Sequence, residues 1–406
     1  MSIDLGLVER APAKPGGFAP VRKTMVRQAV ILAGGRGTRL GELTREVPKP
    51  VIPVGGVPFL SYLIWNLARH GIREIVLSTG YLHEKLRDAL GDGRELGVRL
   101  SYVREREPLG TGGGVRNCLG LLDETFLVLN GDSIFDINYL DLAAGAQGNP
   151  RIALRRVEDA SRFGTVRHRS GRVVQFSEKG AGGPGAINGG IYLLTREVVR
   201  ELPEGAVSLE QDVFPELAAR GRLFCKEYSG FFLDIGVPED LARAQTDVPA
   251  WRRKPALFLD RDVVVEDDSG HGFEDGDFAW RPGVCEAVKA ANDAGWLVFA
   301  VSARPDMGGR DCPGPDSPHF EGIAASGLAD AGAHFDAVYH YPREGRSPAP
   351  AMLAAFGRDW NVDMAASAMI GGSSSGVSEA RRAGVGRWLL HDREPDDLRR
   401  LVLSIL

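Results

Sequence analysis

A glycine-rich turn directly follows an apolar run near the amino-terminal end, in the stretch ILAGGRGTRLGELTREVPKP. Glycines placed after a strand let backbone N–H groups approach a phosphate, because no Cβ stands in the way. A dinucleotide-binding turn would need a third glycine where Leu40 stands, and a Walker A loop would need a lysine where Thr38 follows Gly37. The pattern therefore favours a nucleoside triphosphate that is bound for transfer to another molecule.

Two cationic residues follow these glycines. Arg39 ends the loop and offers a rigid fork of donors that suits a departing pyrophosphate. Lys49 stands between Pro48 and Pro50, which stiffen the backbone and aim its ammonium at the α-phosphate, where negative charge builds during attack. We therefore expect Arg39 and Lys49 to act on the phosphates.

The order of apolar and amphipathic segments predicts an α/β fold. Between Gln28 and about Asp136, short apolar runs alternate with amphipathic segments that end in Gly. This order is typical of βαβ units in a mostly parallel sheet, which binds ligands at the carboxyl ends of its strands. Between Arg151 and Tyr228, strand pairs replace the helices, which predicts a smaller strand-rich lobe inserted in this half or following it.

The length of 406 residues fits two domains better than one core. We predict a flexible leader over residues 1–26, a first α/β domain over 27–248, a linker over 249–256 and a second α/β domain over 257–406. The leader contains much Pro, Gly and Ala and lacks the apolar core of a signal peptide. The linker, PAWRRKPA, precedes a new apolar run, ALFLDRDVVV, which predicts a buried strand.

Composition narrows the classes of partner. The chain is 43% hydrophobic and 25% charged, which is ordinary for a folded protein. Its net charge of -5 and the absence of dense Lys/Arg clusters argue against a nucleic-acid partner. No apolar run approaches the ~20 residues that a membrane helix needs. The four cysteines lie far apart without a C-x-x-C pair, so we expect reduced thiols in a cytoplasm rather than zinc or disulfides.

Two aspartates are candidates for a metal site. Asp132 follows the apolar run of VLNGDS, and Asp234 follows that of FFLDIG. Mg²⁺ prefers few carboxylates together with substrate oxygens, so this pair could hold one ion between the α-phosphate and the attacking phosphate. The protein would then act mainly by aligning the reactants and neutralising charge.

These motifs, in this order, resemble the sugar-phosphate nucleotidyltransferases, or nucleotide-sugar pyrophosphorylases. The family loop G-G-x-G-T-R-L followed by P-K-P matches GGRGTRLGELTREVPKP, and EPLGTGGG, VLNGDS and FFLDIGVPED follow it in order. The resemblance covers about Arg27 to Asp247. It implies a Rossmann-like, GT-A-like domain with a mixed sheet, catalysis by Arg39, Lys49 and Asp132, and Mg²⁺ held by Asp132 and Asp234.

The resemblance also implies the two substrate pockets. Nucleotide-binding positions by this comparison are Leu32, Ala33, Gly34, Gly35, Gly37, Thr38, Gly80, Leu109, Gly110, Thr111, Gly112 and Gly131. In EPLGTGGG, the stretch from Gly110 to Gly113 would let the backbone approach the base. Sugar-phosphate-binding positions are Gly164, Glu178, Lys179, Asn188 and Gly189.

Within this family, the amino-acid sequence of several segments is most similar to that of guanylyltransferases that act on D-glycero-D-manno-heptose 1-phosphate. This implies GTP as the donor, GDP-heptose and pyrophosphate as products, and self-association of the chain. Mannose 1-phosphate, glucose 1-phosphate or another nucleotide stay open as alternatives, because a glycine loop reads a base largely through backbone atoms. A non-catalytic sensor of sugar phosphates or nucleotides is the rival hypothesis from a different class.

The second domain resembles the haloacid dehalogenase-like phosphatases. In LFLDRDVVVEDD, Asp260 stands where that family has its nucleophile and Asp262 where it has its general acid, and Ser302 stands at the phosphate-binding Ser or Thr. The subgroup with the greatest similarity is the D,D-heptose 1,7-bisphosphate phosphatases. Its product is the substrate expected for the first domain.

The later motifs depart from that pattern. Ser347 replaces the family's lysine, and Gly372 and Gly376 replace its two metal-binding aspartates. Without a positive charge and a metal, an aspartate nucleophile is repelled by a phosphate dianion. We therefore favour a degenerate phosphatase that serves scaffolding or assembly. The alternative is a bifunctional enzyme rescued by a neighbouring acid, for which the candidates are Asp267, Asp268 and Glu379.

Overall fold

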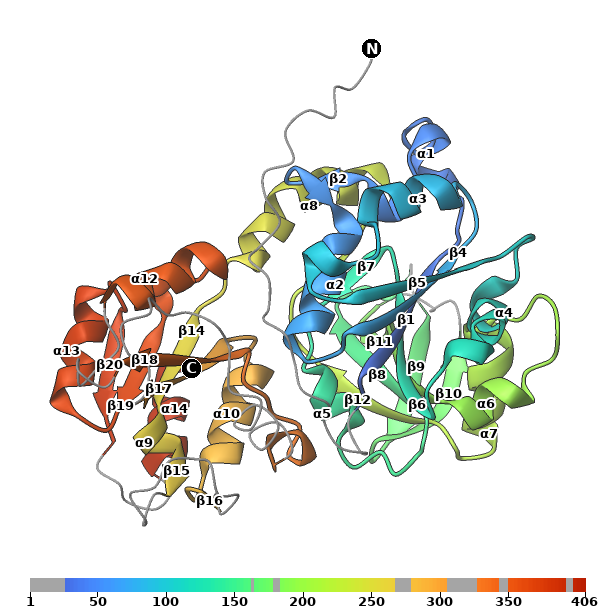
Figure 1. The fold of residues 1–406 in the computed structure, drawn as a ribbon. Helices are drawn as coiled ribbons and strands as arrows, with labels where there is room; N and C mark the ends of the chain where they lie inside the picture. Colours follow the sequence, from blue (N-terminus) through green and yellow to red (C-terminus); the bar gives the residue numbers. More distant parts are fainter. Residues whose placement is uncertain are drawn as a thin grey trace. The chain divides into compact units, whose positions relative to one another are not determined.

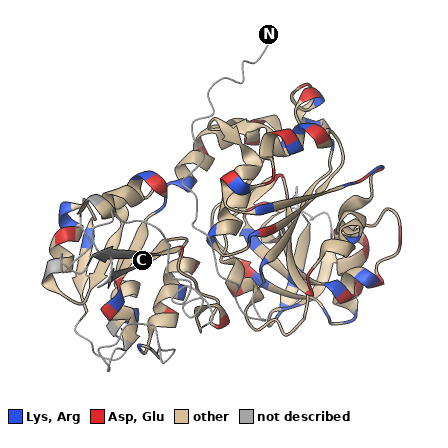
Figure 2. Ribbon diagram, in the orientation of Figure 1, with Lys and Arg blue, Asp and Glu red and all other residues tan. Residues whose placement is uncertain are grey.

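The computed structural model describes residues 26–161, 164–177, 183–266, 279–304, 327–342, 350–391 and 397–406. These residues form two compact units, Val26–Ala250 and Trp251–Leu406 (Figure 1). Residues 1–25 of the predicted leader lie outside the described residues. None of the helices in the described parts of the chain combines the length and hydropathy of a membrane span. Lys/Arg and Asp/Glu positions are interspersed along both units (Figure 2).

The first unit is built on a nine-stranded mixed sheet with the order β5-β4-β1-β6-β11-β8-β12-β10-β9. Its parallel half contains the predicted strands β1 (Gln28–Ala33), β4 (Glu74–Thr79), β5 (Arg99–Arg104) and β6 (Thr125–Asn130). Helices α2 (Phe59–Arg69) and α3 (His83–Leu90) connect these strands. In this half, the apolar runs and amphipathic segments predicted the elements well.

The strand-rich segment after Pro150 extends the same sheet, so it does not form the smaller lobe, inserted in this half or following it, that the sequence predicted. Its strands are β8 (Arg151–Val157), β9 (Thr165–Arg169), β10 (Arg172–Ser177), β11 (Gly185–Thr195) and β12 (Phe224–Tyr228). The long strand β11 runs antiparallel to both β6 and β8 and so joins the two halves. Periodicity identified these strands, but it does not specify which strand pairs with which.

The remaining elements between Val26 and Arg252 connect these strands and cover the sheet. They are η1 (Thr38–Leu40), α1 (Leu43–Glu46), η2 (Lys49–Val51), β2 (Pro53–Val54), β3 (Val57–Pro58), η3 (Arg94–Leu96), α4 (Gly110–Asn117), η4 (Leu119–Leu121), β7 (Ser133–Phe135), α5 (Tyr139–Ala143), α6 (Arg196–Glu201), the π-helix η5 (Leu209–Val213), α7 (Phe214–Ala219), β13 (Phe232–Asp234) and α8 (Pro238–Arg252). A core that includes the fully buried Tyr192, Phe126 and Phe214 holds α4, α6 and α7 on the sheet.

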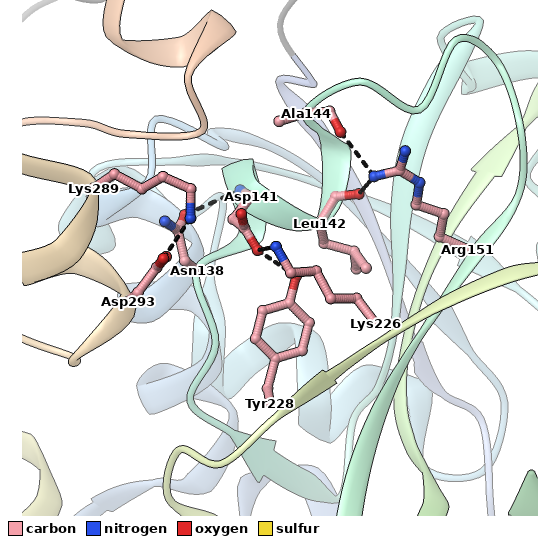
Figure 3. Close-up of polar contacts among 9 residues, drawn as sticks. All are labelled: Asn138, Asp141, Leu142, Ala144, Arg151, Lys226, Tyr228, Lys289 and Asp293. Carbon is pink, nitrogen blue, oxygen red and sulfur yellow. Dashed lines mark hydrogen bonds and ion pairs between the residues drawn. The ribbon is translucent and has the colours of Figure 1, made fainter. Parts of the chain in front are cut away.

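A buried acidic residue fixes α5 to the sheet. Asp141 is 4% exposed, and its Oδ2 lies 2.5 Å from the Lys226 Nζ and accepts a 2.9 Å hydrogen bond from the Tyr228 hydroxyl (Figure 3). Arg151 donates to the carbonyls of Leu142 and Ala144 at the end of the same helix. Lys226 and Tyr228 satisfy the buried carboxylate, and Arg151 satisfies carbonyls at the end of the helix. Since these groups need hydrogen-bond partners when buried, we interpret the cluster as structural.

The second unit contains a parallel five-stranded sheet with the order β18-β17-β14-β19-β20. The strands are β14 (Ala256–Asp260), β17 (Leu297–Arg304), β18 (Ala337–Pro342), β19 (Ala368–Gly371) and β20 (Arg387–Leu390). The remaining elements are α9 (Arg261–Val264), β15 (Val265–Glu266), β16 (Ala279–Trp280), α10 (Val284–Asp293), α12 (Pro350–Asp359), η8 (Met364–Ala366), α13 (Ser374–Arg382) and α14 (Asp397–Ile405). This sheet has its own buried core, as the α/β pattern predicted.

Two local expectations need correction here. The run ALFLDRDVVV is a strand only to Asp260, after which the chain turns into the short helix α9. Much of the predicted linker 249–256 is regular structure, since α8 continues to Arg252 and β14 begins at Ala256. Pro249, the first residue of the predicted linker, lies inside α8.

Candidate functional site

A cavity of about 470 Å³ opens where β1 and β6 end in the first unit. Its lining includes most of the positions that the sequence assigned to the nucleotide and to catalysis. Those positions are Leu32, Ala33, Gly34, Gly35, Gly37, Thr38, Arg39, Lys49, Gly110, Thr111, Gly131 and Asp132. The lining also contains residues that sequence reasoning missed, namely Pro50, Glu105, Pro108, Asn130 and Gly236.

The glycine loop is shaped by positive backbone angles and close contacts. Gly37 has φ +64°, and a Cβ added there would lie 3.0 Å from the Thr44 side chain and 3.2 Å from the Lys49 Cβ. A Cβ on Gly80, which follows β4, would lie 2.9 Å from the carbonyl oxygen of Gly34. Glycine is therefore required at Gly37 for conformation and at Gly80 for space.

Lys49 is buried at the start of η2 and points into the cavity. Its side chain is 7% exposed, and its Nζ lies 2.7 Å from Asp132 Oδ2. The aliphatic part of Lys49 packs beside Gly37, whose added Cβ would lie 3.5 Å from the Lys49 Cδ. The two flanking prolines and this packing hold the ammonium beside the carboxylate.

Asp132 and Asp234 lie side by side. The short strands β7 and β13 pair antiparallel with Ser133 opposite Asp234, and the Ile235 N–H donates to the Asp132 carbonyl over 3.0 Å. Burial first, and then the negative charge of Asp132, raise the pKa of the Asp234 carboxyl above its usual range. Lys49, the Gly236 N–H and Arg39 oppose this shift, so both cations act on Asp234.

This donor set fits Mg²⁺. Two adjacent carboxylates that repel each other gain from a shared divalent cation. Among the described residues, no group of three or more His, Cys, Asp or Glu side chains is placed to hold a metal. An ion bound by Asp132 and Asp234 would therefore take its other ligands from water and substrate phosphates, as Mg²⁺ commonly does.

The segment EPLGTGGG differs from the open loop that the sequence suggested. Gly110 has φ +70° and begins helix α4, so the following glycines are helical. The N–H groups of Gly112 and Gly113 donate to the carbonyl of Val207, and Leu109 accepts from the Val207 N–H. Gly112 and Leu109 are not among the cavity-lining residues. Their backbone groups are used to pack α4 against the segment before η5.

A hydrogen-bond relay connects α4 with β11. The Thr111 hydroxyl donates to Glu210 Oε2 over 2.6 Å, and the Tyr192 hydroxyl donates to Glu210 Oε1 over 2.9 Å. Asn188 in turn donates to the Tyr192 hydroxyl over 2.8 Å. Glu210 lies in the π-helix η5, a local form that is frequent at functional sites. Sequence reasoning missed Glu210, because its partners Thr111 and Tyr192 come from two other segments of the chain.

The predicted sugar-phosphate residues are only partly described. Glu178 and Lys179 lie outside the described residues. The Asn188 N–H donates to the Gly164 carbonyl over 2.9 Å, which pairs these two predicted positions. A Cβ on Gly189 would lie 2.5 Å from the Phe135 ring, so that glycine is needed for packing. None of Gly164, Asn188 and Gly189 lines the cavity.

In the second unit, Asp260 ends the central strand β14 and is 8% exposed. Burial first, and then the charge of Asp262, raise the pKa of Asp260 to about 6. Asp262 is exposed and pairs with its neighbour Arg261 over 3.1 Å. A Cβ on Gly376 would lie 3.8 Å from Asp260 Oδ2. Ser302 is in the adjacent strand β17, and Ser347, Asp267 and Asp268 lie outside the described residues.

Asp260→Asn is expected to stabilise the second unit by about 2–3 kcal/mol at pH 8, since each pKa unit corresponds to about 1.4 kcal/mol. The folded pKa lies above the unfolded value, so the penalty is present above about pH 6 and is relieved as the pH falls toward 3.8. Thermal unfolding of the full chain at pH 8 and pH 5 measures this. Asp330→Asn, at an exposed position, is the control, and equal stability of Asp260→Asn and wild type at pH 8 would contradict the prediction.

Comparison with known proteins concerns the first unit. Residues 28–250 match the family model described as nucleotidyl transferase. A mannose-1-phosphate guanylyltransferase of Mycobacterium tuberculosis is 40% identical over 231 residues, which are 54% of this chain and 64% of that protein. A D-glycero-alpha-D-manno-heptose 1-phosphate guanylyltransferase of Aneurinibacillus thermoaerophilus is 34% identical over 226 residues, 54% of this chain and 98% of that protein.

A solved structure shows the same similarity in three dimensions. The crystal structure of HddC from Yersinia pseudotuberculosis complexed with GMP-PN aligns with a TM-score of 0.50 at 31% sequence identity. The alignment covers 55% of this chain and 100% of that one. The residues matched by the family model, 28–250, include the part of the chain that lines the cavity.

Proposed function

Because the chain belongs to the nucleotidyl transferase family, we propose that its first unit transfers GMP from GTP to a sugar 1-phosphate and releases pyrophosphate. One observation carries this proposal: Arg39, Lys49 and Asp132 line a single cavity, and Asp234 lies directly beside Asp132. Positive and negative groups thus face each other where a triphosphate and an attacking phosphate would meet.

In the proposed reaction, a phosphate oxygen of the sugar 1-phosphate attacks the α-phosphorus of GTP, and the bond to the β-phosphate oxygen breaks. The glycine loop offers N–H groups to the β- and γ-phosphates, and Arg39 neutralises the charge that develops on pyrophosphate. Lys49, held 2.7 Å from Asp132 in the cavity lining, would stabilise the negative charge on the α-phosphate. No side chain needs to form a covalent bond.

Mg²⁺ is the proposed cofactor; Asp132 and Asp234 would hold it, and it would supply Lewis-acid polarisation and positive charge for the phosphates. The two carboxylates alone would repel both phosphates. The positive charges of Lys49 and Arg39 offset part of this repulsion, and the same charges oppose the rise in the pKa of Asp234.

Among sugar phosphates, we propose D-glycero-D-manno-heptose 1-phosphate as the acceptor. Two relatives support this acceptor. The chain covers almost the whole length of each, and both are called heptose 1-phosphate guanylyltransferases. Mannose 1-phosphate is the second candidate, because the relative of 40% identity is called a mannose-1-phosphate guanylyltransferase.

We further propose that the second unit is a degenerate phosphatase with a scaffolding role. Gly372 and Gly376 support this, since they offer no carboxylate near Asp260 and Asp262 where a metal would be needed. Release of phosphate from heptose 1,7-bisphosphate by the full chain at any Mg²⁺ concentration would favour the bifunctional alternative.

A panel of substrates tests the proposed function. We expect the full chain, with Mg²⁺, to release pyrophosphate from GTP and heptose 1-phosphate faster than from any pairing of GTP, ATP, CTP, UTP or dTTP with mannose or glucose 1-phosphate. Omission of the sugar phosphate is the control for simple hydrolysis. If no combination yields pyrophosphate, the proposal is rejected, and if mannose 1-phosphate reacts faster, only the acceptor is revised.

A further inference from the structure

We propose that the edge strand β20 of the second unit pairs antiparallel with the same strand of a second copy of this chain and so forms a dimer. The proposal gives a definite surface to the assembly role suggested for the second unit, but its evidence is the strand itself and not the activity of the first unit. β20 (Arg387–Leu390) is the last strand in the order β18-β17-β14-β19-β20, and no other described strand pairs with its outer side. Figure 1 shows β20 beside helix α13.

The outward backbone groups of β20 belong to Trp388 and Leu390. The N–H groups of Arg387 and His391 donate over 3.1 and 3.0 Å to backbone carbonyls at the two ends of the segment Ser367–Gly371, so both point toward β19. Since backbone groups alternate in direction along a strand, Trp388 and Leu390 direct their N–H and C=O groups away from β19. Outward donors and acceptors of this kind are a template on which another strand can pair.

The side chains at this edge are apolar and exposed. Trp388 is 41% exposed and Leu390 is 52% exposed, and as second neighbours in a strand both lie on the same face. The guanidinium of Arg381 in α13 lies 5.5 Å from the centre of the Trp388 ring, so this is the face that α13 covers. Together with Leu403 and Leu406, they are four of the seven large apolar side chains that are exposed in the described parts of the chain. Because sheet edges are commonly protected by charges or prolines, an apolar edge indicates an interaction surface.

A two-fold axis beside Leu389 satisfies all of the outward groups. In an antiparallel pair of strands, hydrogen-bonded and non-hydrogen-bonded residue pairs alternate. When Leu389 faces Leu389 of the second copy as a non-hydrogen-bonded pair, Trp388 exchanges both hydrogen bonds with Leu390 of that copy, and symmetry repeats the exchange. The indole and the leucine side chain then form an apolar cross-strand pair on one face of the continuous sheet. Because the same surface serves both copies, the assembly closes at a dimer.

The charges on the two sides of β20 favour antiparallel over parallel pairing. A short turn joins α13 to β20, and Arg381, Arg382 and Arg387 are exposed on this amino-terminal side of the strand. The sequence that follows its carboxyl-terminal side, DREPDD over residues 392–397, contains four acids and one arginine. Antiparallel pairing places the basic side of one strand opposite the acidic side of the other, whereas parallel pairing would align like charges. The strand is thus complementary in charge to itself, which favours a second copy of the chain over an unrelated polypeptide.

Sedimentation of the full chain over a range of concentrations tests the proposal. We expect wild type to pass from monomer to dimer with a Kd in the micromolar range, because a four-residue strand and its neighbours form a small interface. Leu390→Pro removes an outward N–H and leaves the bonds to β19 in place, so it should raise Kd by at least about 30-fold, the cost of losing two hydrogen bonds. Leu390→Ala keeps the N–H and should raise Kd less. Leu43→Ala, at an exposed leucine of the first unit, is the matched control and should have no effect.

Cross-linking and salt check the register and the charges. Leu389→Cys places two thiols on either side of the axis in a non-hydrogen-bonded pair, where the Cα atoms lie about 4.5 Å apart, so mild oxidation should give a covalent dimer. Trp388→Cys should not, because the residue opposite it is Leu390. Wild type, which keeps its native cysteines, is the control for oxidation. The wild-type Kd should rise with NaCl concentration, since salt screens the attraction between the charged sides of the two strands.

Two results would overturn the proposal. A wild-type chain that stays monomeric far above micromolar concentration would leave the edge to a different protein, and a dimer that a folded Leu390→Pro chain keeps unchanged would place the contact on another surface. Thermal unfolding of each variant shows that it is folded. Pyrophosphate release by the same samples separates this inference from the proposed function: if no sugar phosphate reacts while the dimer depends on Leu390 as expected, the proposed function fails and the role of β20 stands.

Discussion

Asp132→Asn is expected to lower kcat for nucleotidyl transfer by at least about 10³-fold, since loss of one metal carboxylate removes several kcal/mol of transition-state stabilisation. The substitution keeps the size of the side chain, and the Asp132 carbonyl can still accept from Ile235. It removes the negative charge that faces Lys49. It also removes the carboxylate with which Asp234 would share a cation. Half of the proposed Mg²⁺ site is thereby lost.

The measurement is pyrophosphate release with GTP and sugar 1-phosphate over a range of Mg²⁺ concentrations, together with thermal unfolding. Asp123→Asn changes an exposed aspartate at the other end of β6 and should behave as wild type. High Mg²⁺ should restore only part of the activity, because Asp234 alone provides fewer ligands. Near-normal kcat in a folded Asp132→Asn chain would remove Asp132 from the metal site and from catalysis.

The parts of the site that are local in sequence could be predicted. Gly37, Arg39 and Lys49 lie within one short stretch, and the turn geometry of Gly37 follows from the absence of a Cβ. Asp132 follows a buried strand, so its place at the edge of a parallel sheet follows from the βαβ pattern. Gly37, Arg39 and Lys49 are close in space because they are close along the chain, whereas Asp132 is brought to them by the order of the parallel strands.

The parts that depend on tertiary pairing could not be predicted. Glu210 receives hydrogen bonds from Thr111 and Tyr192, and no local pattern brings those three segments together. The glycines of α4 were interpreted as a contact surface for the base, yet Val207 takes the N–H groups of Gly112 and Gly113. A glycine signals that a backbone is closely approached, but it does not tell whether a ligand or another strand approaches it.

Lys49→Met is expected to lower kcat/KM by about 10²–10³-fold, the usual cost of removing one preorganised charge at the reacting centre. Methionine fits the same buried path past Gly37, so the chain should still fold. Lys49→Arg should not restore activity, because the guanidinium group is larger than an ammonium. The Lys49 side chain is only 7% exposed, so there is little room for the larger group. Pyrophosphate release by both variants, beside unfolding curves, checks these expectations.

The Mg²⁺ requirement distinguishes Lys49 from Asp132. The Lys49 ammonium lies 2.7 Å from the Asp132 carboxylate and opposes the arrival of a second cation there. Without it, Asp132 and Asp234 repel each other more strongly, and a divalent ion gains more by binding between them. Lys49→Met should therefore bind Mg²⁺ more tightly in calorimetry while turning over more slowly. Asp132→Asn should both bind Mg²⁺ more weakly and turn over more slowly. Weaker Mg²⁺ binding by Lys49→Met would contradict a role for Lys49 on the α-phosphate and would instead make it a support for the metal site.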